Sequence, residues 1–293
     1  MRTRLSSIPM LIYRLARRDH DKVAVVDSDL KRYTYRQLNC MADSIRNLFP
    51  MAEPTRVGVL TGAGVGQITA ILAVIKNGGA YVPLDPALNG ACLRRVAREA
   101  NVDFVIADKA NVGRLGDIPA VELPEKIEYT ESDGYAPINF GSRAVACAMP
   151  VGGGRFQELA CVAVRRHASS LCDEFGVSPS DVVMQSSVVT SPMFLAEVFA
   201  TMMKGATLAI LPEKNRGYAK AIADFAERTG VTVICGYRSM VDDLGLLHRL
   251  PSRLRMLIGM ASDKLSGAFA NFNKSDAWRG WFSIDFRRPV ALS

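Results

Sequence analysis

The sequence has little of what marks a metal-binding, secreted or membrane protein. Its six cysteines include no Cys-x-x-Cys pair, and no histidine stands at metal-ligand spacing. We therefore expect no metal site and no disulfide framework, as in a protein of the reducing cytoplasm. The apolar stretch at residues 8–12 is too short for a signal-peptide core, and no run reaches the roughly 20 apolar residues of a membrane helix. The sequence predicts a cytoplasmic protein without a membrane partner.

The sequence also lacks the charge pattern of a nucleic-acid-binding protein. Its 36 Lys and Arg exceed its 29 Asp and Glu, so the net charge is +7, but no basic stripe with interleaved aromatic residues follows from this. Short clusters such as Arg17-Arg18 and Arg287-Arg288 are typical of solvated faces. With 49% hydrophobic and 22% charged residues, the chain has the composition of a folded globular protein. We expect no nucleic-acid partner.

Short β-branched runs alternate with helical patterns along the chain, which predicts an α/β fold of two helix-flanked, largely parallel sheets. Thr34 and Gln37 form a capping-box pattern before one helix, and Gly78 with Gly79 predicts the end of another. Prolines and mixed charges over residues 108–142 predict a loop-rich crossing, which divides the chain into approximate units 1–140 and 141–293. Strands are predicted at 23–26, 56–60, 81–84, 102–107, 181–185, 207–211, 231–234 and 254–258, and helices at 67–76, 93–100, 194–203, 218–228 and 239–247.

A glycine cluster at residues 62–66 follows a predicted strand and precedes a predicted helix, where a dinucleotide-binding turn would lie. The third glycine of the G-x-G-x-x-G pattern would be Gln67, however, and no acidic residue ends a strand about twenty positions later. The spacing favours a tight strand-to-helix turn, and a nicotinamide oxidoreductase is the weaker alternative.

A longer motif carries more information. Residues 76–86, KNGGAYVPLDP, resemble the second core motif of amino-acid adenylation domains in nonribosomal peptide synthetases, which belong to the adenylate-forming superfamily. Residues 33–39, YTYRQLN, resemble an early segment of that family. Residues 204–213, KGATLAILPE, resemble the stretch after its fourth core motif, with Glu197 at the position of its structural glutamate. The resemblance implies the AMP-binding N-terminal portion of an adenylation domain over residues 1–293. The family's small C-terminal domain would be missing, so we expect a truncated domain.

The resemblance also implies a reaction, in which ATP with Mg²⁺ activates an amino or carboxylic acid and a carrier-protein thiol takes the acyl group. In the family, a loop rich in Ser, Thr and Gly and ending Pro-Lys-Gly holds the phosphates. The corresponding stretch here has no Ser, Thr or Lys over residues 150–160. The lysine position is occupied by Gln157, or by Ala160 if the alignment slips, and Glu158 adds a charge that opposes triphosphate. Our candidates for nucleotide contact are Gly152, Gly153, Gly154 and Arg155.

Other family positions differ as well. Pro192 stands where the family has an aspartate that pairs with the substrate ammonium group, and residues 259–262, GMAS, replace Gly-Gly-Glu. Residues 284–290, IDFRRPV, replace Tyr-Gly-Pro-Thr-Glu, and Asp285 there is better interpreted as a surface carboxylate than as a metal ligand. His20, His167 and His248 have no patterned nucleophile or carboxylate partner. We therefore name no catalytic residue.

Two hypotheses follow from the resemblance. The first is a catalytically impaired or inactive adenylation homologue, a pseudoenzyme that serves as a binding or scaffold remnant of a peptide synthetase system, with a carrier protein or synthetase modules as partners. Losing one preorganised charge contact costs on the order of 3 kcal/mol of transition-state stabilisation, and several are lost here. The alternative is an active adenylate-forming ligase that uses Arg155, ATP and Mg²⁺ and is completed by a separate C-terminal domain. A non-catalytic partner protein with an exposed apolar face is a third reading.

Overall fold

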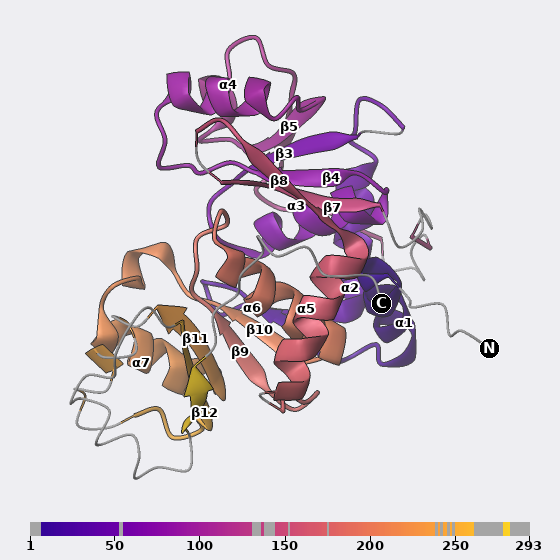
Figure 1. The fold of residues 1–293 in the computed structure, drawn as a ribbon. Helices are drawn as coiled ribbons and strands as arrows, with labels where there is room; N and C mark the ends of the chain where they lie inside the picture. The colour runs from indigo at the N-terminus through magenta and orange to yellow at the C-terminus, as the bar shows by residue number, and fades with distance from the viewer. Residues whose placement is uncertain are drawn as a thin grey trace, which may run out of the picture. The chain divides into compact units, whose positions relative to one another are not determined.

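The chain folds into two compact units, each built on one β-sheet with flanking helices (Figure 1). The first unit comprises Met1–Ala24 and Tyr33–Arg166, and the second comprises Val25–Arg32 and His167–Ser293. The α/β class is therefore confirmed. This computed structural model describes residues 7–52, 55–130, 136–137, 144–151, 153–174, 176–237, 240, 243–244, 247, 250–260 and 278–281.

The first unit contains a six-stranded sheet in the order β6-β5-β3-β4-β7-β8. Its pairings are parallel except for the antiparallel pair β7–β8, which agrees with the predicted parallel topology. Two features differ from expectation. A strand, β6, lies inside the segment predicted to be loop-rich, and the glycine-containing stretch is a hairpin. The strands are β3 (Arg56–Leu60), β4 (Ala80–Pro83), β5 (Phe104–Asp108), β6 (Ala120–Leu123), β7 (Val145–Pro150) and β8 (Phe156–Ala160).

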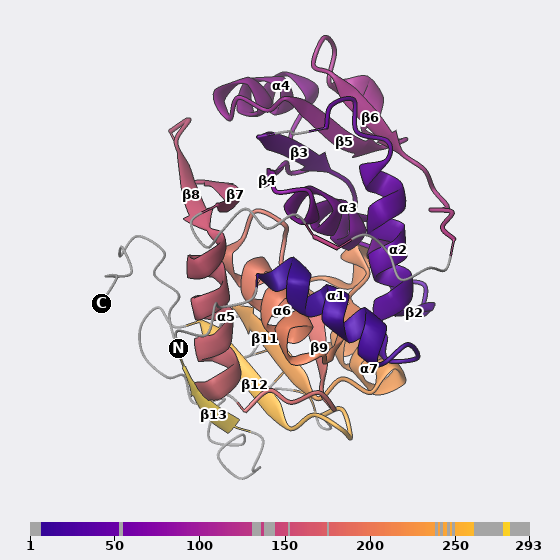
Figure 2. The same cartoon turned by 90° about the vertical axis from the view of Figure 1, so that its right-hand side faces the viewer.

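Three mutually packed helices, α1 (Ile8–Arg18), α2 (Tyr35–Arg46) and α3 (Val65–Lys76), lie beside this sheet, with α3 against β3 and β4 (Figure 2). The capping box of α2 is confirmed, since Gln37 N donates to Thr34 Oγ1 at 3.2 Å and Thr34 N donates to Gln37 Oε1 at 3.0 Å. After α3, Gly78 has φ 83°, the left-handed conformation that the predicted glycine cap requires. Helix α4 (Gly90–Glu99) and the short η1 (Val112–Arg114) complete the unit.

The second unit contains a seven-stranded sheet in the order β13-β12-β11-β9-β10-β1-β2, and the pairings from β13 through β1 are parallel. The β1 and β2 strands lie where the chain passes between the units. The predicted strands over residues 23–26, 181–185 and 207–211 are confirmed within one or two residues. The strands are β1 (Val23–Val26), β2 (Arg32–Thr34), β9 (Val182–Gln185), β10 (Thr207–Ile210), β11 (Val233–Tyr237), β12 (Met256–Met260) and β13 (Trp278–Trp281).

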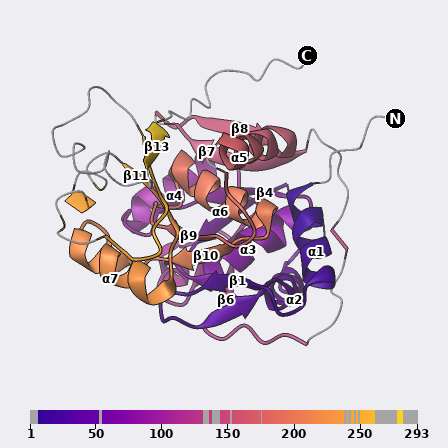
Figure 3. The same ribbon diagram turned by 90° about the horizontal axis from the view of Figure 1, so that it is seen from below.

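Helices α6 (Pro192–Lys204) and α7 (Ala219–Thr229) confirm two predicted helices. Since β10 and β11 lie on opposite sides of β9, right-handed crossovers place α6 and α7 on opposite faces of the sheet. Figure 3 shows strands β9 and β10 between the two helices. The unit also includes η2 (Glu213–Asn215), and α5 (Cys161–Glu174) continues from the hairpin of the first unit. Most of the helix predicted over residues 239–247 lies outside the described residues.

None of the helices in the described part of the chain has both the length and the apolar character that a bilayer crossing requires.

Candidate functional site

The predicted nucleotide-contact residues lie at the tip of the hairpin that joins β7 to β8. Val151 N donates to Arg155 O at 2.9 Å and closes a tight turn. Gly153 and Gly154 have φ angles of 60° and 70°, a region that an L side chain enters only at a cost. Gly152 lies outside the described residues. The glycines therefore form the turn at the tip of the hairpin, and Arg155 is the residue that closes this turn.

The exposed tip offers few groups that hold a phosphate. Arg155 is exposed, and it forms no ion pair with any residue that the structure describes. A second charge lies beside the tip, because a β-carbon at Gly154 would lie 3.2 Å from Oε2 of Glu99, at the end of α4. Nothing in the sequence signalled this carboxylate, which is more than fifty residues away along the chain. An anion at the tip would therefore meet one guanidinium group and one carboxylate.

Glu158, which we expected to oppose triphosphate, forms an ion pair with a residue of the sheet. It lies within β8, beyond the turn, where its carboxylate accepts a hydrogen bond from Arg56 of β3 in an ion pair. Arg56 also donates to Ala100 O at 2.7 Å, which orients its guanidinium group. The charge of Glu158 is thus offset within the sheet. The carboxylate that lies against Gly154 is that of Glu99.

In the second unit, Glu197 of α6 has a fully buried carboxylate that binds the segment after β9. Ser187 donates from N at 3.2 Å and from Oγ at 2.9 Å, and Ser186 donates from N at 3.3 Å and from Oγ at 3.1 Å. Burial raises the pKa of Glu197 to about 7, although the serine hydrogen bonds favour the ionised form. The glutamate that the resemblance identified as structural therefore connects α6 to the end of β9.

A cavity of about 20 Å³ lies beside Glu197, with Met193, Ala196, Cys235 and Ile258 in its wall. This volume accommodates about one water molecule and no amino-acid side chain. Pro192 is the first residue of α6, after the N-cap Ser191, whose Oγ accepts from Met193 N at 3.1 Å. Proline fits the first position of a helix because it has no backbone N–H, and an N–H at this position would have no partner within the helix. Its place in the fold is that of a helix-initiating residue.

Metal-ligand clusters are not found in the described ranges, where no three His, Cys, Asp or Glu side chains gather. His20 lies near the surface, with Nδ1 3.4 Å from Arg36 Nη1. The remaining histidine side chains, Asp285 and residues 261–262 fall outside what the structure describes. All six cysteines are free thiols.

A family model described as AMP-binding enzyme matches residues 12–139. The hybrid PKS-NRPS synthetase poxE of Penicillium oxalicum is 24% identical over 280 residues, which cover 89% of this chain and 7% of that protein. Surfactin synthase subunit 2 of Bacillus subtilis is 27% identical over 227 residues, which cover 75% of this chain and 6% of that protein. The chain thus spans less than a tenth of the length of these curated relatives.

Solved structures share the fold. The AMPPNP-bound form of the nonribosomal peptide synthetase FmoA3 has a TM-score of 0.82 at 21% identity, and the match covers 91% of this chain and 30% of the FmoA3 chain. ATP-bound MatB from Rhodopseudomonas palustris has a TM-score of 0.77 at 19% identity, and the match covers 91% of this chain and 57% of the MatB chain. Both comparisons agree with the two sheets and their flanking helices.

Proposed function

We propose that the chain is a catalytically impaired or inactive homologue of the amino-acid adenylation domains of the adenylate-forming superfamily, and that it serves as a binding or scaffold module; its similarity to an AMP-binding enzyme model and to peptide synthetases supports this proposal. The chemistry of the hairpin tip carries this proposal. Arg155 is its one cationic side chain, its described backbone is formed by glycines, and the Glu99 carboxylate lies against Gly154.

The residues at this tip do not fit the triphosphate of ATP. A phosphate site requires converging amide donors, hydroxyl groups or cations, so that charge is neutralised without reorganisation. Residues 150–160 contain no Ser, Thr or Lys, and Arg155 is the one cationic residue among them. We therefore derive no adenylation step through these residues.

A second candidate function is that of a working ligase that activates an amino or carboxylic acid with ATP. The exposed guanidinium of Arg155 favours it, because this group can donate two parallel hydrogen bonds to a phosphate. The AMPPNP-bound and ATP-bound states of the neighbouring structures also favour it. Under this alternative, Arg155 replaces the lost loop lysine.

Amino-acid-dependent ATP–pyrophosphate exchange by the purified chain distinguishes the two functions. The impaired homologue shows no exchange with any amino acid of a full panel, and clear turnover would overturn the proposal. In the working ligase, Arg155→Gln abolishes exchange, Arg155→Lys retains part of it, and Arg18→Gln, an exposed arginine of α1, leaves it unchanged.

Calorimetric titration with ATP and Mg²⁺ tests the physical reason directly. We expect the native chain not to bind ATP with micromolar affinity. Glu99→Gln should increase any weaker affinity for ATP, because it removes a negative charge from the hairpin tip. Micromolar binding that Arg155→Gln removes would contradict the proposed inactivity.

The binding role of the module is proposed from its relatives. They are synthetases many times longer than this chain, so an isolated carrier protein or a neighbouring synthetase module is the expected partner. Sedimentation of the chain with a candidate carrier protein should give a stoichiometric complex. Independent sedimentation at tens of micromolar would count against this role.

A further inference from the structure

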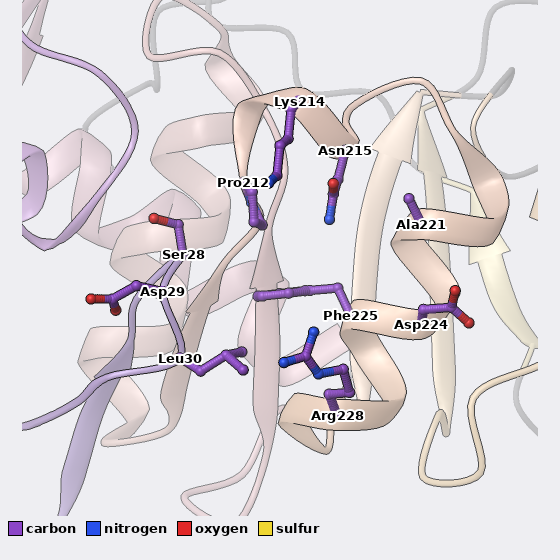
Figure 4. Close-up of a pocket in the computed structure, with 10 residues that line it drawn as sticks. All are labelled: Ser28, Asp29, Leu30, Pro212, Lys214, Asn215, Ala221, Asp224, Phe225 and Arg228. Carbon is purple, nitrogen blue, oxygen red and sulfur yellow. The ribbon is translucent and has the colours of Figure 1, made fainter.

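A cavity of about 450 Å³ lies within the second unit, outside the carboxyl ends of two strands (Figure 4). Residues 28–30 follow β1 and residues 212–215 follow β10, while α7 forms the remaining wall. Because β1 and β10 are parallel neighbours, their carboxyl ends lie at the same edge of the sheet. Ligands of open α/β sheets bind in crevices at this edge, and the volume lies within the roughly 300–1,000 Å³ of small-molecule pockets.

The middle of the cavity is apolar. Phe225 is 4% exposed and projects from α7 between Pro212 and Leu30 (Figure 4). Leu30 has φ 71°, which is strained for a side chain other than glycine. Its turn is closed by Leu30 N donating to Asp27 O, and by Asp27 N donating to Lys31 O, both at 2.8 Å. A glycine would suit this backbone better, but it would leave the wall without its side chain.

Polar groups surround this apolar centre in an ordered way. Figure 4 shows the ends of Lys214, Asn215 and Arg228 pointing toward Phe225, while the carboxylates of Asp29 and Asp224 point away from it. Neither Lys214 nor Arg228 forms an ion pair with the residues that the structure describes. Two cationic groups therefore face one aromatic ring without a carboxylate between them.

We propose that this cavity binds a small organic anion that carries a flat ring. The ring lies between Leu30 and Pro212, next to the buried Phe225, and the anionic group is held by Arg228 and Lys214, with Asn215 as an additional donor. A guanidinium group suits a carboxylate or a phosphate because its two parallel donors match two oxygens. The site is separate from the hairpin tip in the other unit, so it does not depend on the proposed function.

Titration of the whole chain with 2-naphthoate and 2-naphthyl phosphate tests the site and separates a carboxylate ligand from a phosphate ligand. Neutral 2-naphthamide and ring-free acetate are the matched controls. We expect at least one aryl anion to bind about tenfold or more tightly than either control, because charge and ring contribute together. Equal affinity for 2-naphthamide, or no binding of either aryl anion at millimolar concentration, would overturn the proposal.

Variants locate the binding within this cavity. Lys214→Ala and Arg228→Ala should each weaken aryl-anion binding about tenfold, whereas Lys220→Ala, an exposed lysine of α7 outside the cavity wall, should not. Leu30→Gly should weaken binding without lowering the melting temperature, since glycine accepts the turn geometry. Retained affinity in both cation variants would place the ligand elsewhere and refute the assignment.

Discussion

Replacing Asp43 by alanine would leave the ammonium group of Lys76 buried without its carboxylate. Lys76 Nζ lies 2.6 Å from Asp43 Oδ1, and the two side chains are 5% and 8% exposed. The same nitrogen donates to Asn39 Oδ1 at 2.8 Å and lies 6.0 Å from the centre of the Tyr13 ring. Burial lowers the pKa of Lys76, and the hydrogen bond and charge of Asp43 oppose that shift. The pair therefore joins α2 to α3 inside the helical layer.

The free-energy cost that we expect for Asp43→Ala depends on how deeply the ion pair is buried, and not on the distance between its charged atoms. Removing one partner of a buried ion pair costs about 3–5 kcal/mol, because the remaining charge loses both its partner and its solvent. Arg98 and Asp117 form a pair of almost the same length, 2.7 Å, but their side chains are 60% and 76% exposed. Exposed pairs contribute about 0–1 kcal/mol. Asp43→Ala should thus reduce the free energy of unfolding several times more than Asp117→Ala.

Urea denaturation at pH 7, followed by far-ultraviolet circular dichroism, measures both variants on the same chain. The double variant Asp43→Leu with Lys76→Met should recover most of the loss, because apolar side chains replace a buried pair at little cost. The deficit of Asp43→Ala should also shrink as the pH rises toward 10, since Lys76 then binds more protons in the unfolded chain than in the folded one. Equal losses in Asp43→Ala and Asp117→Ala would refute the reasoning.

Three further predictions concern groups whose environment is equally well defined. Burial raises the pKa of Glu197 to about 7, above its ordinary 4.5, so the free energy of unfolding falls as the pH rises from 4.5 to 7. Glu197→Gln should remove up to about 3 kcal/mol of this pH-dependent loss, as measured by melting curves recorded across that pH range. Burial alone would raise the pKa of Asp181, but hydrogen bonds from Arg255 and its neighbours outweigh burial and lower it to about 2. The stabilisation is present above pH 4 and is lost as the pH falls toward 2, so Asp181→Asn should cost about 2 kcal/mol at neutral pH and flatten acid denaturation; an unchanged acid midpoint contradicts this. Finally, Gly154→Ala should lower the melting temperature more than Gly153→Ala, because both have positive φ but only the first meets a carboxylate at 3.2 Å, and equal effects would show that the hairpin tip adapts.

Elements with strong local signals could be predicted from the sequence. The capping box of Thr34 and Gln37 is present, and β3 has the predicted bounds. The strand β6 was missed because its AVEL sequence is short and largely exposed, so its pairing with β5 defines it as a strand. The β7–β8 hairpin was missed for a related reason. Its two strands are defined by their antiparallel pairing with each other, which the sequence does not show. The glycines between them were interpreted through the family resemblance and not as a turn.

Charged contacts were less accessible to sequence reasoning than the fold. The likeness to adenylation domains located Glu197, but its bonds to Ser186 and Ser187 require α6 to pack against the end of β9. The Arg56–Glu158 pair joins residues more than one hundred positions apart, so nothing in the sequence indicated that Glu158 has a cationic partner in β3.

Local order in the chain determined the helices and strands that carry strong caps, turns or apolar periodicity, because these signals act between residues a few positions apart. The absence of Ser, Thr and Lys from residues 150–160 was likewise evident from the sequence. The tertiary structure decided which charges face one another. It placed Glu99 at the glycine turn and gathered Lys214, Phe225 and Arg228 around one cavity. Such contacts depend on strand order and helix packing, which bring distant segments together by burying apolar surface.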